Sequence, residues 1–191
     1  MTEFPKQYEW LLKEGSPKMI VEFLKLYGIR ETIGQQDNPQ ILEWAKELSI
    51  EEYVHDSIAW CGLEHALVAY RAGKIQLSSG KLYIDNNGEL KEFHPLWAAN
   101  WLQFGTPVDS ALLGYTLVFK RTGGNHVGLY IGEDNECYHV GGGNQSDMVR
   151  ISRIAKSRCI GIRKPPYKTQ EPANVRKIIL SPEGEVSTNE A

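Results

Sequence analysis

The sequence lacks a long apolar run, a recognisable secretory signal and a surplus of charge of one sign. A membrane-spanning helix needs roughly 18 or more apolar residues in a row, and no stretch of the 191-residue chain approaches that length, so no membrane insertion is expected. The opening residues, MTEFPKQYEWLLKEG, carry early acids and no apolar core before a cleavage site, which predicts synthesis in the cytoplasm without a signal peptide. The formal net charge of −3 gives no electrostatic case for nucleic acid as a partner.

Cysteine is scarce as well, and the signatures of metal and nucleotide sites are missing. Three cysteines, an odd number, argue against a disulfide framework and favour a reducing compartment. Cys61 and His65 share a helical face, but no CxxC and no further histidine cluster accompanies them, so we expect no metal. The glycines at 141–143 are not followed by the Lys-Ser or Lys-Thr of a phosphate loop. We expect no cofactor.

The first part of the chain carries helix signals. Hydroxyl or amide caps followed by proline occur at Ser16-Pro17 and Asn38-Pro39, before the amphipathic stretches MIVEFLKLYG and QILEWAKEL. Apolar residues at helical spacing predict a third helix over 61–72, and HPLWAANWLQFG (94–105) predicts a fourth that glycine ends.

From Tyr115 onward the pattern changes to short β-rich runs, YTLVF, HVGLYI, ECYHV, MVRI and CIGIR, separated by turn residues. Helices followed by a meandering sheet predict an α+β fold, with N-terminal helices packed on an antiparallel sheet of five to six strands. We expect one domain over residues 1–167, with a turn-rich segment at 74–93 that includes a hairpin at Asn87-Gly88. Residues 168–191 are polar and predict a flexible or docking tail.

Cys61 and His126 are the candidate catalytic pair. Cys61 follows Trp60 at the start of a predicted helix, where the positive end of the helix dipole favours a thiolate. His126 opens the strand-like run HVGLYIG, where it is held rigidly enough to act as the base. A cysteine and a histidine far apart in sequence and close in space form the nucleophilic site of papain-like enzymes. The alternative is one more buried cysteine and a turn histidine.

A third group should orient the imidazole. His139 on the next predicted strand and Asn144 in the loop GGGNQSD are both candidates, and periodicity does not choose between them. Around the pair, substrate contacts are expected from Trp60, Glu64 and Gln145. Their alternatives are core packing for Trp60, a solvated helix edge for Glu64 and a turn for Gln145.

Five pieces in order carry a family resemblance: Trp60-Cys61, GYTLVFKR (114–121), NHVGLYIG (125–132), GGGNQSD (141–147) and IGIRKPP (160–166). Together they resemble the NlpC/P60-like cysteine peptidases, and most closely the small phage and prophage wall hydrolases with a GGNQ signature. The resemblance covers about residues 8–166, and the segment 74–93 looks like an insertion beside the cleft.

The resemblance implies a papain-like core and hydrolysis of an amide bond in peptidoglycan, within the stem peptide or between muramic acid and L-alanine. Position by position it makes Cys61 the nucleophile and His126 the general base, with Asn144 slightly favoured over His139 as the third member. The partners would be peptidoglycan stem peptides, and the site of action the bacterial cell wall, reached by release, in a virion or by injection.

The chain departs from that family after the nucleophile, where WCGLEHA places Glu64 and His65 near Cys61. Three other functions stay open. The first is a catalytically impaired wall-binding or virion structural protein, which would contact other phage structural proteins. The second is an antibacterial effector delivered by contact, for which an immunity protein would be the partner. The third uses the same pair to transfer acyl or amide groups on a substrate outside the wall.

Overall fold

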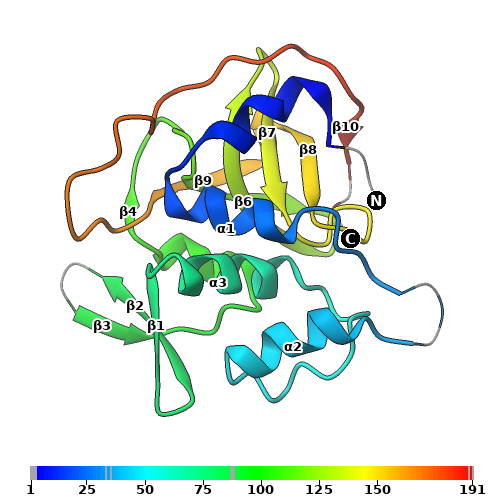
Figure 1. The fold of residues 1–191 in the computed structure, drawn as a ribbon, viewed down its shortest axis with the longest axis vertical. Coiled ribbons are helices and arrows are strands. Elements are labelled where there is room, and N and C mark those ends of the chain that lie inside the picture. Colours follow the sequence, from blue (N-terminus) through cyan, green and yellow to red (C-terminus); the bar gives the residue numbers. More distant parts are fainter. Residues whose placement is uncertain (1–3, 33, 35, 87–88, 189, 191) are drawn as a thin grey trace.

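The structure is a computed structural model that describes residues 4–32, 34, 36–86, 89–188 and 190. It is a mixed α+β fold in which helices precede most of the strands (Figure 1). The helices described are η1 (Lys6–Lys13), α1 (Lys18–Leu26), α2 (Pro39–Glu47), α3 (Cys61–Arg71), η2 (Ala98–Gln103) and η3 (Lys156–Arg158), where η marks a 3-10 helix.

Three of the four predicted helices are confirmed, and one is wrong in type. α2 begins as expected, because the Asn38 side chain accepts a hydrogen bond from the Gln40 N–H at 2.8 Å. α1 has no such cap, since the Ser16 hydroxyl donates instead to Asn174, 2.6 Å away. The segment 94–105 forms only η2, because the Trp101 indole donates to the Pro95 carbonyl at 3.0 Å and holds the first residues in a turn.

In the described part of the chain the main sheet has seven strands, one more than the upper end of the expected range. Their order is β10-β8-β7-β6-β5-β9-β4. The strands are β4 (Thr106–Pro107), β5 (Thr116–Arg121), β6 (Gly124–Glu133), β7 (Cys137–Gly142), β8 (Arg150–Ala155), β9 (Cys159–Lys164) and β10 (Val186–Ser187). All neighbours are antiparallel except β10 and β8, which pair in parallel. The two edge strands have two residues each, and so short a strand has no sequence pattern.

Apolar side chains cover both faces of the sheet. On one face α1 and α3 pack on the sheet, where residues such as Val127 and Leu129 belong to the larger core, and α2 packs against α3. The other face has a smaller cluster that includes Leu117, Phe119 and Tyr130. The alternation of side chains along the strands produces the two cores, because successive residues point to opposite faces.

The segment 74–93 forms a second sheet of three strands, β1 (Ile75–Ser78), β2 (Lys81–Asn86) and β3 (Glu89–Glu92). The expected turn at Asn87-Gly88 lies outside the described residues, and the flanking strands pair antiparallel. Ile75, Leu82 and Ile84 join the larger core, so this sheet is fixed to the domain.

The segment after Lys164 runs back across the molecule (orange and red in Figure 1). Ile178 and Leu180 pack against the larger core, and the Leu180 N–H donates to the Glu133 carbonyl at 2.9 Å. The described part of the predicted tail 168–191 therefore docks on the domain that precedes it.

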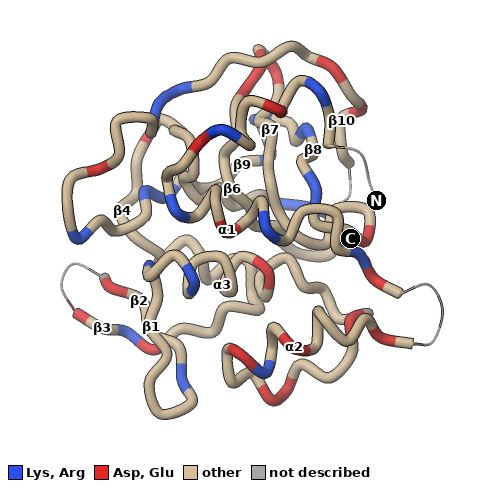
Figure 2. The backbone as a smooth tube through the Cα atoms, in the orientation of Figure 1, with Lys and Arg blue, Asp and Glu red and all other residues tan. Residues whose placement is uncertain are grey.

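Acidic and basic residues are mixed over much of the described backbone, whereas residues 95–119 contain a single charged residue, Asp109 (Figure 2). In the described part of the protein, we find no helix with the length and apolar character that crossing a bilayer requires.

Candidate active site

Cys61 is the first residue of α3, as the sequence predicts. Gly62 allows this turn to approach the chain at 95–96 closely, since a Cβ there would lie 2.3 Å from the Pro95 carbonyl oxygen. The same packing buries the nucleophile candidate, and only 3% of Cys61 is exposed.

The sulfur of Cys61 is held against the start of β6. The backbone N–H groups of Gly62 and Val127 both act on the thiol and lower its pKa, as does the charge of Arg121. Burial has the larger effect, so the pKa of Cys61 lies above its usual value. The sequence predicts a thiolate at this position, and in the described conformation the thiol is neutral at neutral pH.

His126 is adjacent to Val127 and is completely buried. Burial is the main reason that its pKa is lowered to about 4, and Arg121 and Arg158 lower it further. Neither ring nitrogen makes a hydrogen bond among the described residues. The ring is therefore a neutral imidazole, the form that a general base requires.

Gln145, in the GGNQ loop, is close enough to His126 to raise the pKa of its ring, although no hydrogen bond joins the two side chains in the described conformation. Its Nε2 donates to the carbonyls of Val140, Gly142 and Arg150 at 2.7 to 3.1 Å. Its Oε1 makes no hydrogen bond among the described residues. The side chain is thus fixed at one end and has an unused acceptor at the other, which suits a group that orients an imidazole N–H.

Asn144, the other candidate in this loop, is buried and has a φ of +53°. Asparagine tolerates this left-handed conformation better than most residues. The loop is close to α3, because a Cβ on Gly143 would lie 2.6 Å from the Glu64 Cβ and 2.7 Å from the Trp60 ring.

His139 is not brought to His126. In the register of β6 and β7 it lies opposite Gly132, six residues along β6 from His126, which corresponds to about 20 Å of strand. Both of its ring nitrogens are in use, with Nδ1 2.7 Å from the Tyr8 hydroxyl and Nε2 3.0 Å from the Asp134 carboxylate. The expectation that His139 orients the base is wrong for this conformation.

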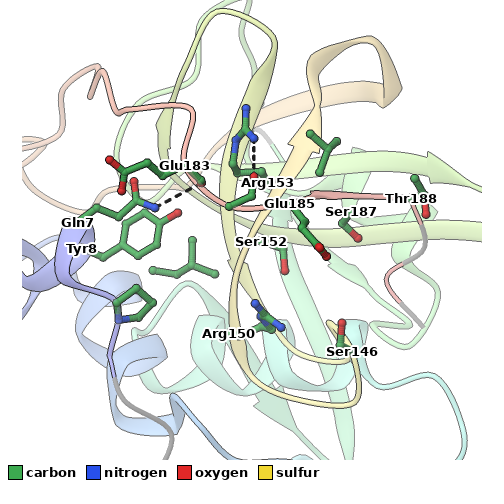
Figure 3. Close-up of a pocket in the computed structure, with 14 residues that line it drawn as sticks. Gln7, Tyr8, Ser146, Arg150, Ser152, Arg153, Glu183, Glu185, Ser187 and Thr188 are labelled. Carbon is green, nitrogen blue, oxygen red and sulfur yellow. Dashed lines mark hydrogen bonds between the residues drawn. The ribbon is translucent and has the colours of Figure 1, made fainter.

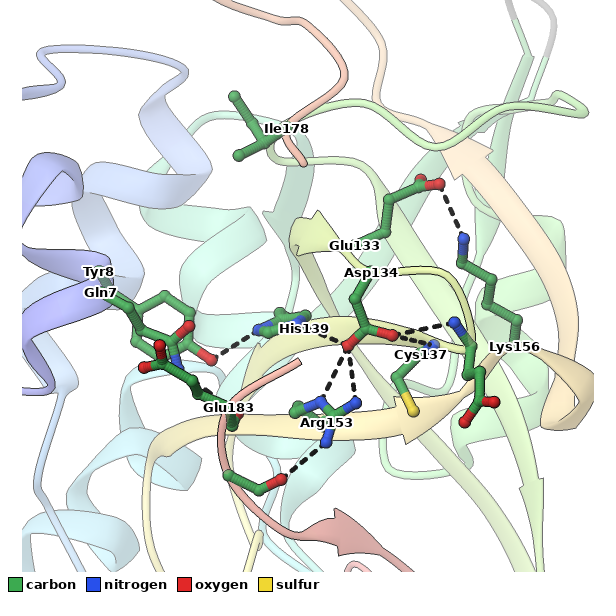
Figure 4. Close-up of polar contacts among 12 residues, drawn as sticks. Gln7, Tyr8, Glu133, Asp134, Cys137, His139, Arg153, Lys156, Ile178 and Glu183 are labelled. Atoms are coloured by element: carbon green, nitrogen blue, oxygen red, sulfur yellow. Dashed lines mark hydrogen bonds and ion pairs between the residues drawn. The ribbon is translucent and has the colours of Figure 1, made fainter. Parts of the chain in front are cut away.

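His139 belongs to a buried polar network that joins the N-terminal segment to the sheet (Figure 4). Asp134 is its centre and accepts from Arg153 at 2.9 Å and from the backbone N–H groups of Glu136 and Cys137. These donors hold the pKa of Asp134 well below its usual value, although burial opposes them. The network therefore has a structural role, because it fixes the N-terminal segment to the sheet.

The three expected substrate contacts are all buried. Trp60 is fully covered, packs against Trp44 and donates from its indole to Glu31 at 2.5 Å. Gln145 is 1% exposed and bonded to backbone, as described above. None of the three reaches solvent in the described conformation, in which Cys61 and His126 are buried as well, so the expected substrate contacts stay predictions.

Glu64 is the third of them, and burial raises its pKa to about 8. Its Oε2 accepts from the Gly143 N–H at 3.2 Å, and its Oε1 has no hydrogen-bond partner in the described residues. His65 is also buried, with its pKa lowered to about 3, and it lies 2.9 Å from the Thr116 hydroxyl and edge-on to Trp101. Both polar residues that follow Cys61 are therefore neutral core residues.

A groove of about 530 Å³ lies nearby, between the N-terminal segment, β8 and the tail (Figure 3). Its lining includes Ser146 and Arg150 on one side and Glu183 and Glu185 on the other. Neither Cys61 nor His126 lines it. Among residues 4–32, 34, 36–86, 89–188 and 190, no group of three or more His, Cys, Asp or Glu side chains is placed to hold a metal ion.

Sequence reasoning missed the network of Asp134, His139 and Arg153 and the contact that Glu190 makes with Arg158. Arg153 sits in a strand-like run with alternating apolar residues, which was a signal for an inward-facing charge. The pairing of Glu190 had no signal, because it joins two polar segments that are remote in sequence.

The comparisons with known proteins leave the family open. No protein-family model matches the chain, and no curated protein and no solved structure is significantly similar to it.

Proposed function

We propose that the protein is a cysteine hydrolase that cleaves an amide bond of peptidoglycan, with Cys61 as nucleophile and His126 as base. The observation that carries this proposal is the contact between the first turn of α3 and the start of β6. It sets the Cys61 sulfur against the Val127 N–H, one residue from His126. The neutral imidazole and the backbone donors at the sulfur are the parts that thiol activation requires.

In the proposed reaction, His126 takes the proton of the Cys61 thiol and the sulfur attacks the amide carbonyl carbon. The Cys61 N–H at the helix terminus stabilises the oxyanion, an effect of several kcal/mol in comparable sites. The imidazolium gives its proton to the departing amine, which leaves a thioester. Water, deprotonated by His126, then hydrolyses the thioester to a carboxylic acid and restores the thiol.

Gln145 orients the ring of His126 in this proposal, through its unused Oε1. Asn144 is the position that the family resemblance favours, so the two are tested separately. Gln145→Ala should lower kcat far more than Asn144→Ala, with little change in KM, because a misdirected imidazole affects the chemical step. The opposite ranking would assign the role to Asn144.

The substrate class rests on the five matching pieces in their order, which resemble wall hydrolases. The test is digestion of purified sacculi, followed by mass spectrometry of the released muropeptides. Cys61→Ala should abolish release, whereas Cys159→Ala, which removes a partly exposed thiol on β9, should not. Full activity of Cys61→Ala would refute the assignment, and the product masses would identify the bond.

A second candidate is a wall-binding or structural protein that has lost catalysis. The burial of Cys61 and His126 and the raised pKa of the thiol favour it. Alkylation by iodoacetamide separates the two, because a reactive Cys61 is modified well below pH 8.5, the pKa of a free thiol. Sacculus binding without alkylation or product release would support this candidate.

A further inference from the structure

Glu190 is the last described residue, and it is almost fully buried, at 1% exposed. Its carboxylate forms a two-pronged ion pair with Arg158, at 2.8 Å from Nη1 and 2.5 Å from Nη2. A planar guanidinium bound at two points to a carboxylate is among the stronger polar contacts in proteins. A glutamate is almost never fully buried unless it is paired, so the buried position of Glu190 depends on this ion pair.

The position of this ion pair relates it to the candidate active site. Arg158 donates from Nε to the Lys120 carbonyl at 3.0 Å and directly precedes Cys159. Cys159 lies opposite Phe119 in the sheet, and Phe119 lies opposite His126. Glu190 therefore reaches the corner of the sheet that holds His126, and among the charged groups it has the largest effect on the pKa of that ring.

Residues 183–188, which precede Glu190 in the tail, are held on the domain mainly by polar contacts. Arg153 donates to the Gly184 carbonyl at 2.7 Å, and Arg158 to the Ser187 carbonyl at 3.0 Å. Apart from these, β10 pairs with β8 over only two residues, and Val186 is 43% exposed. Figure 3 shows the segment lying across β8, with Glu183 and Glu185 near the groove that Arg150 and Arg153 line.

The attachment changes abruptly along the tail. Ile178 and Leu180 are anchored in the larger core, whereas residues 181–186 are exposed. A stretch with few buried apolar contacts opens at low cost compared with the domain. Residues 181–182 therefore mark the boundary between the anchored part of the tail and its weakly held end.

We propose that residues 183–188 and Glu190 form an internal cap over the His126 side of the candidate site, with Arg158 as the carboxylate-binding group that keeps the cap in place. The cap rests on the proposed function, and it accounts for a buried base in a hydrolase. The cap also predicts which ligands could open it. A substrate or partner that takes the place of Glu190 should carry a carboxylate, because that is the group that Arg158 binds.

The test measures how fast iodoacetamide modifies Cys61 at neutral pH, in a background with Cys137→Ser and Cys159→Ser. Glu190→Gln removes the charge that pairs with Arg158, and Glu185→Gln, an exposed glutamate of the same segment, is the matched control. A chain that ends at Pro182 lacks the whole cap. We expect Glu190→Gln to raise the rate about tenfold, since the loss of a charged hydrogen bond has effects of that order. The shortened chain should react at least as fast, and Glu185→Gln should not differ from the parent.

Addition of the peptide EGEVSTNE, which corresponds to residues 183–190, should slow alkylation of the shortened chain. Parent-like rates in both Glu190→Gln and the shortened chain would overturn the cap. If the shortened chain does not fold, as judged by circular dichroism, Glu190→Gln against Glu185→Gln decides alone. The readout needs no substrate, so faster alkylation without lysis of sacculi would refute the proposed function and leave the cap standing.

Discussion

Replacement of Glu64 by glutamine should change how the stability of the protein depends on pH. Glu64 is 1% exposed, and burial raises its pKa from the usual 4.5 to about 8. It is therefore protonated in the folded protein at neutral pH and ionised in the unfolded chain. Glutamine has nearly the same shape as the protonated acid and does not titrate. Glu64→Gln therefore removes the contribution of this carboxyl group to the pH dependence of stability.

The sign follows from the raised pKa. The contribution of Glu64 to stability is fully present below pH 4.5 and is lost as the pH rises toward and through about 8. Each pH unit in this window costs about 1.4 kcal/mol. Between about pH 5.5 and 7.5 the wild type should lose about 2 to 3 kcal/mol that Glu64→Gln keeps, or about 5 to 10 °C in Tm for a domain of this size.

The assay is urea unfolding of both proteins across this pH range, followed by circular dichroism. His65 and His126 have lowered pKa values, so their contributions are lost as the pH falls, the opposite direction. They are common to both proteins and cancel in the difference. Glu89→Gln, at an exposed position on β3, controls for the general effect of one less charge. A difference between wild type and Glu64→Gln that does not vary with pH would refute the assignment of a protonated Glu64.

Three further predictions follow from the packing and electrostatics of the site. Gly143→Ala should cost about 1 to 3 kcal/mol in unfolding free energy, because the new Cβ meets the Trp60 ring at 2.7 Å; unchanged stability in urea would contradict the tight contact. His139→Ala should lower stability by a similar amount, about 1 to 3 kcal/mol, because it leaves Asp134 without one partner. The alkylation rate of Cys61 should stay unchanged. A loss of Cys61 reactivity in the folded variant would connect His139 to the site. The His126 ring should remain neutral down to about pH 4, and an NMR titration midpoint near 6.5 in the intact chain would show that it is not buried as described.

The candidate site could be predicted from the sequence where local signals are strong. Cys61 begins α3 because the apolar residues that follow it recur at helical spacing. His126 lies on a strand because HVGLYIG has the β-rich pattern of a buried strand. Asn38 caps α2 for a reason that is entirely local.

The third member of the site could not be predicted, because the choice depends on register and on partners from remote segments. His139 and Asn144 were equivalent on periodicity alone. The pairing of Gly132 with His139, and the presence of Tyr8 and Asp134 at its two nitrogens, remove His139 from the site. Gln145 was expected to contact substrate or form a turn, yet its amide is fixed by three carbonyls of its own sheet.

By itself, the sequence determined the α+β class, the helix that presents Cys61 and the strand that carries His126, since hydrophobic period and caps act within a few residues. Only the tertiary structure decided which polar groups are buried, and hence that the thiol, the imidazole and Glu64 are all neutral at neutral pH. It also decided that Glu190 pairs with Arg158 beside the site. Burial and pairing depend on segments that meet only in the folded chain, and no local pattern encodes them.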